Sequence, residues 1–104
     1  MLSDRFEISL YLDFYGDLLT NHQKEILDDY YNEDLSMNEI AENYEISKSA
    51  VQDLIKRSIN QLENYEKALK LVEKDKKFEI ILEDMRKENN AQVNKYIERL
   101  EEIK

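Results

Sequence analysis

The side chains best suited to chemistry in this chain of 104 residues gather between positions 47 and 57. A Gln side chain can pair with the edge of adenine, and Lys and Arg can pair with guanine or with phosphate oxygens. The segment therefore indicates contacts to nucleic acid. The candidate nucleic-acid-binding residues are Ser47, Lys48, Ser49, Gln52, Lys56 and Arg57.

The charge of the chain is distributed unevenly around this segment. The 15 basic and 24 acidic residues give a formal charge of −9. Residues 1–47 hold two basic and twelve acidic side chains, a net of −10, whereas residues 48–62 have a net of +2 and residues 63–104 are nearly balanced. This acidity excludes a protein whose whole surface binds nucleic acid, and it predicts weak binding that is focused on the one cationic stretch.

Catalytic and metal-dependent chemistry is not indicated. The chain has no cysteine and one histidine, His22, so it lacks the ligand clusters of zinc sites and the thiol of a cysteine nucleophile. With a single glycine it also lacks a glycine-rich phosphate loop. We therefore expect no enzyme activity, no catalytic residue, no cofactor and no bound metal.

The cationic stretch lies inside a segment, SMNEIAENYEISKSAVQDLIKR at 36–57, with the layout of a helix-turn-helix motif. Ala41 is small enough to let two helices cross closely, and Ile46 is placed to fill the turn. Ser47 is a candidate N-cap for the second helix, the one that would enter a groove of DNA. Two acids modify the pattern: Asp53 lies among the candidate contacts, and Glu45 stands where such turns usually have a glycine.

The elements that position the motif are predicted to be helices throughout. Thr20–Gln23 and Ser36–Glu39 have the spacing of capping boxes, and proline is absent. Apolar residues recur at intervals of three and four, which is the period of an amphipathic helix. The fold class expected is all-α. The first helix is predicted from an apolar stripe of Phe6, Leu10, Tyr11, Phe14, Tyr15 and Leu18.

Residue 62 divides the chain into two predicted parts, a helix-turn-helix domain at 1–62 and a charged helical tail at 63–104. A polar patch at 73–77 interrupts the tail and predicts a bend there. Two arrangements remain open, an intermolecular coiled coil that makes a homodimer and an intrachain hairpin. The candidate dimerisation seam consists of Leu62, Tyr65, Leu69 and Val72, at the spacing of a coiled coil.

The stretch LTNHQKEILDDYYNEDLSMNEIAENYEISKSAVQDLIKRSINQL, from Leu19 to Leu62, resembles region 4 of bacterial sigma factors. With DFYGDLLT before it and the charged tail after it, nearly the whole chain is more similar to the YlxM-like family of small helix-turn-helix proteins. That resemblance implies an association with the signal recognition particle, because the family's genes lie beside those of the particle's GTPases. It also implies a regulatory role in protein targeting, with the six candidate residues on the recognition helix.

Two functions are compatible with these observations. The first is a regulatory protein that binds nucleic acid, DNA rather than RNA, through the helix starting at Ser47. The second is a non-catalytic interaction module whose acidic N-terminal half binds a basic protein such as a targeting GTPase.

No apolar run approaches the roughly 18 residues of a spanning helix, and the absence of cysteine fits a reducing compartment. We expect a cytoplasmic protein with no membrane span.

Overall fold

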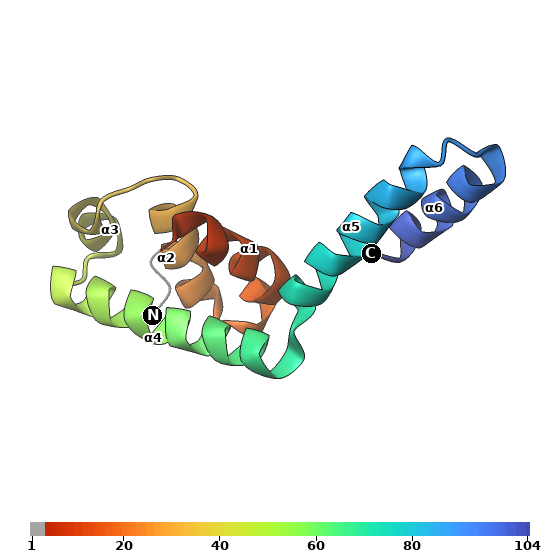
Figure 1. The fold of residues 1–104 in the computed structure, drawn as a ribbon. Coiled ribbons are helices and arrows are strands. Elements are labelled where there is room, and N and C mark those ends of the chain that lie inside the picture. Colours follow the sequence, from red (N-terminus) through yellow and green to blue (C-terminus); the bar gives the residue numbers. More distant parts are fainter. Residues whose placement is uncertain (1–3) are drawn as a thin grey trace. The chain divides into compact units, whose positions relative to one another are not determined.

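The computed structural model describes residues 4–104, most of which lie in helices joined by short connections (Figure 1). No strand occurs in this part of the chain, and the all-α expectation is confirmed. The elements in chain order are α1 (Arg5–Tyr15), the single 3₁₀ turn η1 (Gly16–Leu18), α2 (Asn21–Tyr31), α3 (Met37–Tyr44), α4 (Lys48–Leu69), α5 (Leu71–Lys87) and α6 (Ala91–Ile103).

Helix starts follow the predicted capping residues. The Thr20 hydroxyl accepts a hydrogen bond from the Gln23 N–H at 3.1 Å, and the Gln23 side chain accepts one from the Thr20 N–H at 3.0 Å. Ser36 and Glu39 make the same reciprocal pair at the start of α3. Each box satisfies two backbone groups that a helix end would otherwise leave without partners, and both predicted boxes are confirmed.

The chain divides into two compact units, the first ending at Val72 and the second running from Glu73 to Lys104. In the first unit α4 packs against α1, α2 and α3, which gives the three shorter helices a common support. The core is made of aliphatic side chains and one tyrosine from all four helices. Its fully buried members are Ile8, Tyr15, Ile26, Leu27, Ile40, Val51 and Leu62.

The buried side of α1 differs from the stripe seen in the sequence. Ile8 and Leu12 point into the core, whereas Phe6 is 70%, Phe14 37% and Leu18 55% exposed. Both sides of this helix are apolar, so a period of 3.6 residues does not by itself identify the side that packs. The structure shows that α1 supports the core with one side and leaves an apolar row in solvent on the other.

The break between α4 and α5 falls at one residue, Lys70, whose backbone is left-handed with φ 56° and ψ 32°. The predicted bend at 73–77 is wrong, because these residues lie inside the continuous helix α5. The polar patch there is part of the hydrated surface of α5. The change of apolar phase had a real cause, but the turn producing it comes three residues earlier and uses a lysine instead of a glycine.

Two side chains from the first unit cap the start of α5. The buried Tyr15 hydroxyl donates to Glu66 Oε1 at 2.5 Å and accepts from the Leu71 N–H at 3.0 Å. The same Glu66 oxygen accepts from the Val72 N–H at 3.0 Å. Burial, and next the hydrogen bond to Glu66, raise the pKa of Tyr15 above its ordinary value, so the phenol stays neutral. A helix without an N-cap side chain of its own is thus started by α1 and α4.

The predicted dimerisation seam is occupied within its own chain. Leu62 is fully buried and Val72 is 3% exposed, both in the core of the first unit, and Tyr65 is half-buried against that core. Only Leu69 is exposed, at 45%. The four residues therefore do not form an open row along one helix, since α4 uses this side to pack against α1 and α2 and Val72 lies beyond the break.

The second unit is an intrachain helical hairpin, one of the two arrangements that the sequence left open. Leu82 of α5 and Ile97 of α6 are buried between the helices. Asn89, with φ 49°, lies in the connection. Arg86 bonds to Glu101 across the hairpin, which ties the last turn of α5 to the last turn of α6.

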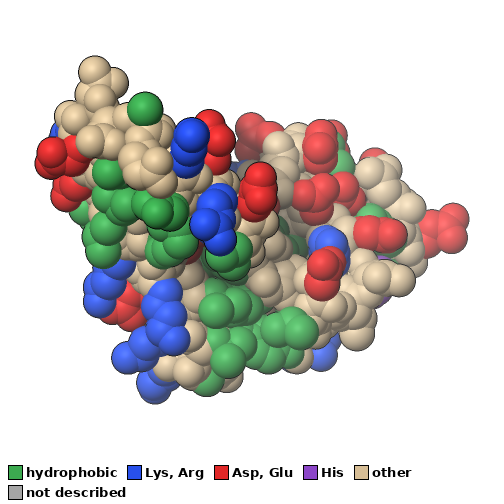
Figure 2. All heavy atoms as spheres, turned by 90° about the vertical axis from the view of Figure 1, so that its right-hand side faces the viewer, with side chains coloured by type: hydrophobic (Ala, Val, Ile, Leu, Met, Phe, Trp, Pro, Cys, Tyr) green, Lys and Arg blue, Asp and Glu red, His purple; other side chains and the backbone are tan. Residues whose placement is uncertain are grey.

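Within residues 4–104 no helix is both long and apolar enough to cross a membrane. Hydrophobic side chains are nevertheless part of the surface. Figure 2 shows one face of the molecule, on which they lie in patches among Lys, Arg, Asp and Glu side chains.

Candidate nucleic-acid interface

The turn between α3 and α4 is built by backbone hydrogen bonds. The Ile46 N–H donates to the Ala41 carbonyl at 3.0 Å and the Glu45 N–H to the Glu42 carbonyl at 3.3 Å, which is the pattern of a Schellman motif. Glu45 takes the left-handed conformation this motif requires, with φ 56° and ψ 43°. The glycine position of the helix-turn-helix thus keeps its geometry with a glutamate in it.

Packing fixes the angle between the two helices of the motif. Ile40 and Val51 are fully buried, and Ala41 and Leu54 are each 8% exposed. Ile46 packs against the same core from the turn. The close approach of α3 and α4 expected from the small Ala41 side chain is therefore present, and it holds α4 rigidly with one side free.

The six candidate contact residues are placed together by α4 and its cap. The Ser47 hydroxyl accepts from the Ala50 N–H at 3.0 Å and so starts the helix at Lys48. The five candidate residues within α4 then follow at about 100° per residue. They cover one half of the helix circumference, opposite the side that is buried in the core. All of them are exposed: Ser47, Lys48, Ser49, Gln52, Lys56 and Arg57.

Asp53 lies within this surface and pairs with a candidate residue. Its Oδ2 accepts from Arg57 Nε at 2.9 Å, and the two side chains are 66% and 67% exposed. An exposed pair of this kind contributes on the order of 0.3–0.5 kcal/mol and is screened by salt. Arg57 can therefore exchange its partner for a phosphate at small cost, while Asp53 lowers the local positive potential.

Acidic side chains on α3 and in the turn border the surface. Glu39, Glu42 and Glu45 are exposed. Hydrogen bonds from the backbone and the hydroxyl of Ser36 hold the pKa of Glu39 below its ordinary value, so its carboxylate stays charged. These carboxylates precede Ser47 closely in the sequence and lower the positive potential at the start of α4.

The structure adds amide side chains that the sequence reasoning missed. Gln23 of α2 and Asn60 and Gln61 of α4 line a shallow hollow of about 280 Å³ together with Arg57. Gln23 Nε2 donates to Gln61 Oε1 at 2.6 Å. The spacing of the sequence could have identified Asn60 and Gln61, because they follow Arg57 by three and four residues and therefore lie on the same side of the helix.

Comparison with known proteins agrees with this geometry. A family model described as "Putative helix-turn-helix protein, YlxM / p13 like" (UPF0122) matches residues 2–103. A UPF0122 protein of Clostridium perfringens strain 13 is 47% identical over 109 residues, covering 98% of this chain and 97% of the relative. Another, from Clostridium novyi strain NT, is 40% identical over 110 residues, covering 99% and 94%. A third, from Malacoplasma penetrans strain HF-2, is 51% identical over 69 residues, covering 66% and 64%.

Proposed function

This chain belongs to the UPF0122 family of helix-turn-helix proteins similar to YlxM and p13, and from that premise we propose that it is a regulatory protein that binds nucleic acid through α4. One observation supports the proposal above others. The helix that the motif presents to solvent coincides with a stretch of net positive charge, +2 over residues 48–62, which follows a segment of net charge −10 over residues 1–47. The protein acts by binding and performs no catalysis.

The preferred ligand is duplex DNA. The major groove of B-form DNA admits an α-helix, whereas the deep, narrow major groove of A-form RNA does not. In this proposal Gln52 reads a base edge, Lys56 and Arg57 neutralise phosphates, and Lys48 and Ser49 hold the helix start against the backbone. The neighbouring acids keep the affinity low and make it strongly dependent on salt.

Fluorescence anisotropy with duplex DNA and with a structured RNA, each titrated over a series of salt concentrations, tests this function. Replacing both Lys56 and Arg57 by Ala should remove two phosphate contacts and reduce the slope of log K against log salt by about 1.8. A control that replaces Lys87 and Lys95 by Ala makes the same change of charge in the second unit and should leave the slope unchanged. Absence of binding at about 50 mM salt, where such contacts are strong, would refute the proposal.

We extend the proposal to the signal recognition particle pathway, in the cytoplasm. The support is the resemblance to the YlxM-like family and the membership of the chain in it. In the same anisotropy assay the particle's own RNA is compared with duplex DNA of equal length and with an unrelated structured RNA. Preference for the particle's RNA over the unrelated RNA supports a role in the pathway, and equal binding to both RNA molecules contradicts it.

A second candidate function is a protein-interaction module. It is favoured by one observation, the net charge of −10 over residues 1–47, which suits a basic partner such as a targeting GTPase. Calorimetric titration with the purified GTPase distinguishes the two functions. Binding that weakens with salt and persists in the Lys56 and Arg57 variant favours the interaction module.

We also propose that the protein is a homodimer, because two copies can present their α4 helices to successive grooves. Leu62 and Val72 are buried, so the contact must use other residues.

A further inference from the structure

An apolar ridge is made of Phe6, Leu10 and Phe14 on the exposed side of α1 and of Leu18 in the 3₁₀ turn η1 that follows. Phe6, Leu10 and Phe14 follow one another at intervals of four within α1, so they lie in one row, and Leu18 follows Phe14 by the same interval beyond the end of this helix. Leu10 is half-buried, while the three others are 37–70% exposed. The opposite side of α1 packs in the core and Leu10 also packs against that core, so the exposed part of the ridge consists of Phe6, Phe14 and Leu18.

Acidic side chains flank the ridge. Asp13 and Asp17 stand one position before Phe14 and Leu18 and follow the same interval of four. Both are exposed, and Asp17 Oδ1 accepts from Lys24 Nζ at 2.5 Å. The surface that would meet a partner is therefore apolar along its crest and negative along one edge.

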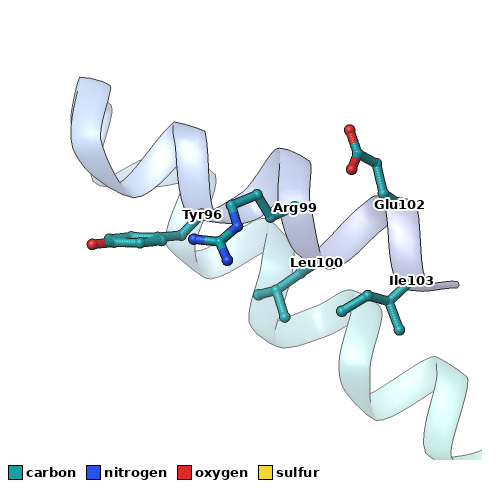
Figure 3. A pocket seen from close by; sticks show the side chains of 5 residues that line it. All are labelled: Tyr96, Arg99, Leu100, Glu102 and Ile103. Carbon is teal, nitrogen blue, oxygen red and sulfur yellow. The ribbon is translucent and has the colours of Figure 1, made fainter.

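The hairpin of α5 and α6 also has an exposed apolar side. Ile81 is 60%, Tyr96 49% and Ile103 82% exposed, and Leu100 is half-buried. A hollow of about 660 Å³ runs along α6 past Tyr96, Leu100 and Ile103. Figure 3 shows Leu100 and Ile103 side by side, with Glu102 pointing the other way.

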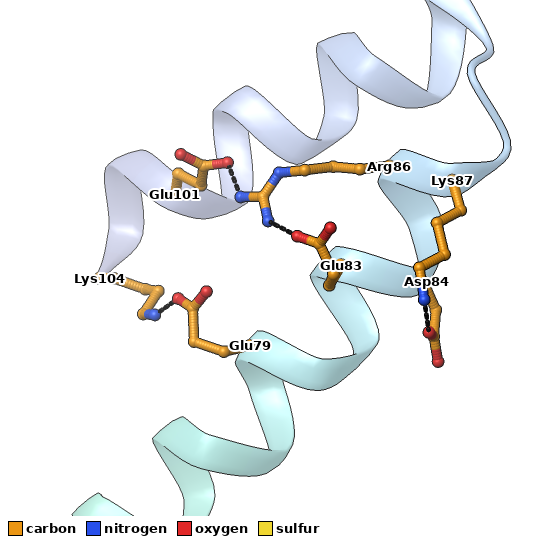
Figure 4. A network of polar contacts seen from close by, with 7 residues as sticks. All are labelled: Glu79, Glu83, Asp84, Arg86, Lys87, Glu101 and Lys104. Carbon is orange, nitrogen blue, oxygen red and sulfur yellow. Dashed lines mark hydrogen bonds and ion pairs between the residues drawn. The ribbon is translucent and has the colours of Figure 1, made fainter.

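Ion pairs occupy the other side of the hairpin. Arg86 bonds to both Glu83 and Glu101, and Lys104 to Glu79 (Figure 4). At about 100° per residue, Ile81 lies some 160° around α5 from Glu79, and Tyr96 about 140° around α6 from Glu101. The apolar residues of the two helices consequently share the side opposite the ion pairs.

Basic side chains flank this apolar side. Lys77 and Lys74 precede Ile81 by four and seven residues and lie beside it on α5, and both are exposed. Arg99 lies next to Tyr96 on α6 and lines the same hollow (Figure 3). Lys77 also pairs with Glu73 of its own helix at 3.3 Å, so Lys74 and Arg99 contribute most of the positive edge that this apolar surface offers to the ridge.

We propose that two copies of this chain associate by docking the hairpin of each on the α1 ridge of the other. The opposite charges at the two edges favour this pairing over its alternatives. Ridge against ridge would bring Asp13 and Asp17 of two chains together, and hairpin against hairpin would do the same with Lys74 and Lys77. When the hairpin of each chain docks on the ridge of the other about a two-fold axis, the same contact forms twice. No surface is then left for a third copy, and the assembly is a closed dimer.

This interface goes beyond nucleic-acid binding and does not depend on it. Sedimentation measures the oligomer, whereas anisotropy measures the complex with DNA, so either proposal can fail while the other holds. If the protein is a dimer that does not bind DNA, the proposed interface stands and the proposed DNA binding fails. If the protein is a monomer that binds DNA, only the proposed interface fails.

Sedimentation equilibrium of the full chain across the micromolar range is the first test. The wild-type chain should approach twice its mass of 12.5 kDa. Phe14→Ser on the ridge and Ile81→Ser on the hairpin should each raise the dissociation constant by about tenfold or more. Ile80→Ser is the control for loss of an exposed isoleucine, since Ile80 is the preceding residue of α5, is 63% exposed and lies about 100° around the helix from Ile81; it should raise the dissociation constant much less than Ile81→Ser does.

Mixing two monomeric variants identifies which surfaces meet. A chain with Phe6→Ser and Phe14→Ser keeps its hairpin, and a chain with Ile81→Ser and Tyr96→Ser keeps its ridge. Each alone should stay monomeric, while the mixture should form a heterodimer through the one remaining contact. A wild-type monomer, a dimer sensitive to only one of the two surfaces, or a mixture that does not associate each overturns the proposal.

Charge reversal gives an independent check. Asp13→Lys should weaken the dimer by placing three lysines together, and adding Lys74→Glu and Lys77→Glu in the same chain should restore at least part of the lost affinity. Circular dichroism confirms that each variant keeps its helices. If Lys74→Glu and Lys77→Glu do not restore association, the proposed contact between the acidic edge of the ridge and the basic edge of the hairpin is wrong.

Discussion

Replacing Glu45 by glycine should stabilise the protein. Glu45 has φ 56° and ψ 43°, a left-handed conformation that brings the Cβ of an L-residue too close to the following carbonyl. Relief of this contact is worth about 1–2 kcal/mol, and the greater freedom of glycine in the unfolded chain offsets about 0.4–1 kcal/mol. The side chain is exposed, so little packing is lost. The net expectation is a gain of about 0.5–1 kcal/mol in the free energy of unfolding.

Urea denaturation measures the gain as a shift of the midpoint by roughly 0.3–0.8 M at constant slope. Glu45→Ala is the matched control, because it also removes the carboxylate but retains a Cβ in the left-handed conformation. Alanine should therefore leave stability nearly unchanged. A glycine variant no more stable than the alanine variant would refute the reasoning, since the backbone conformation would then not be the origin of the effect.

Three other changes test separate parts of the structure. Asp53→Asn removes the acid that pairs with Arg57 and should raise the affinity for duplex DNA by about three- to tenfold, measured by anisotropy at fixed salt. Tyr15→Phe deprives the Leu71 N–H and a Glu66 oxygen of a buried partner and should lower the free energy of unfolding by about 1–2 kcal/mol in urea. Burial, and next the hydrogen bond to Asp29, raise the pKa of Tyr44 from 10.0 to about 12. Its contribution to stability is then complete below pH 10 and lost as the pH rises through 12, so Tyr44→Phe should flatten the alkaline decline of the urea midpoint in this range.

The sequence predicts helix starts well because each depends on a few neighbouring residues. Thr20, Ser36 and Ser47 all cap the helices expected of them, through hydrogen bonds that reach only three residues along the chain. The helix-turn-helix core was equally readable, since Ile40, Val51 and their partners repeat at the period of two crossing helices. Such local and periodic signals are sufficient for the fold class.

The ends of helices were harder to predict, because this chain does not mark them with glycine. Its single glycine, Gly16, is right-handed at φ −56°, and an added Cβ there would meet Lys24 Cε at 3.4 Å. The left-handed positions fall on other residues: Asp34, Glu45, Lys70 and Asn89. The composition therefore contains no signal for the break at Lys70, and the polar patch at 73–77 predicts the turn three residues too late.

Burial was least predictable where a helix is apolar on two sides. The spacing of Leu62 and Val72 is that of a coiled-coil seam, yet both are core residues, because the break at Lys70 turns the start of α5 back onto its own unit. Phe6 and Phe14 have core spacing and are exposed. Spacing along one helix states which residues share a side, but only the packing of other helices determines which side is covered.

The cap that Tyr15 and Glu66 place on the start of α5 determines how short a working fragment can be. A chain cut after Leu62 would lose Glu66 and the buried Val72, and it would leave the Tyr15 hydroxyl in the core without its carboxylate. A fragment ending at Leu69 would keep Glu66 but lose both N–H groups that the pair binds. Fragment design, segmental isotope labelling of the first unit and fusion of reporter domains should therefore place their junction after Val72. This position lies inside α5, a helix that the secondary structure alone would advise leaving whole.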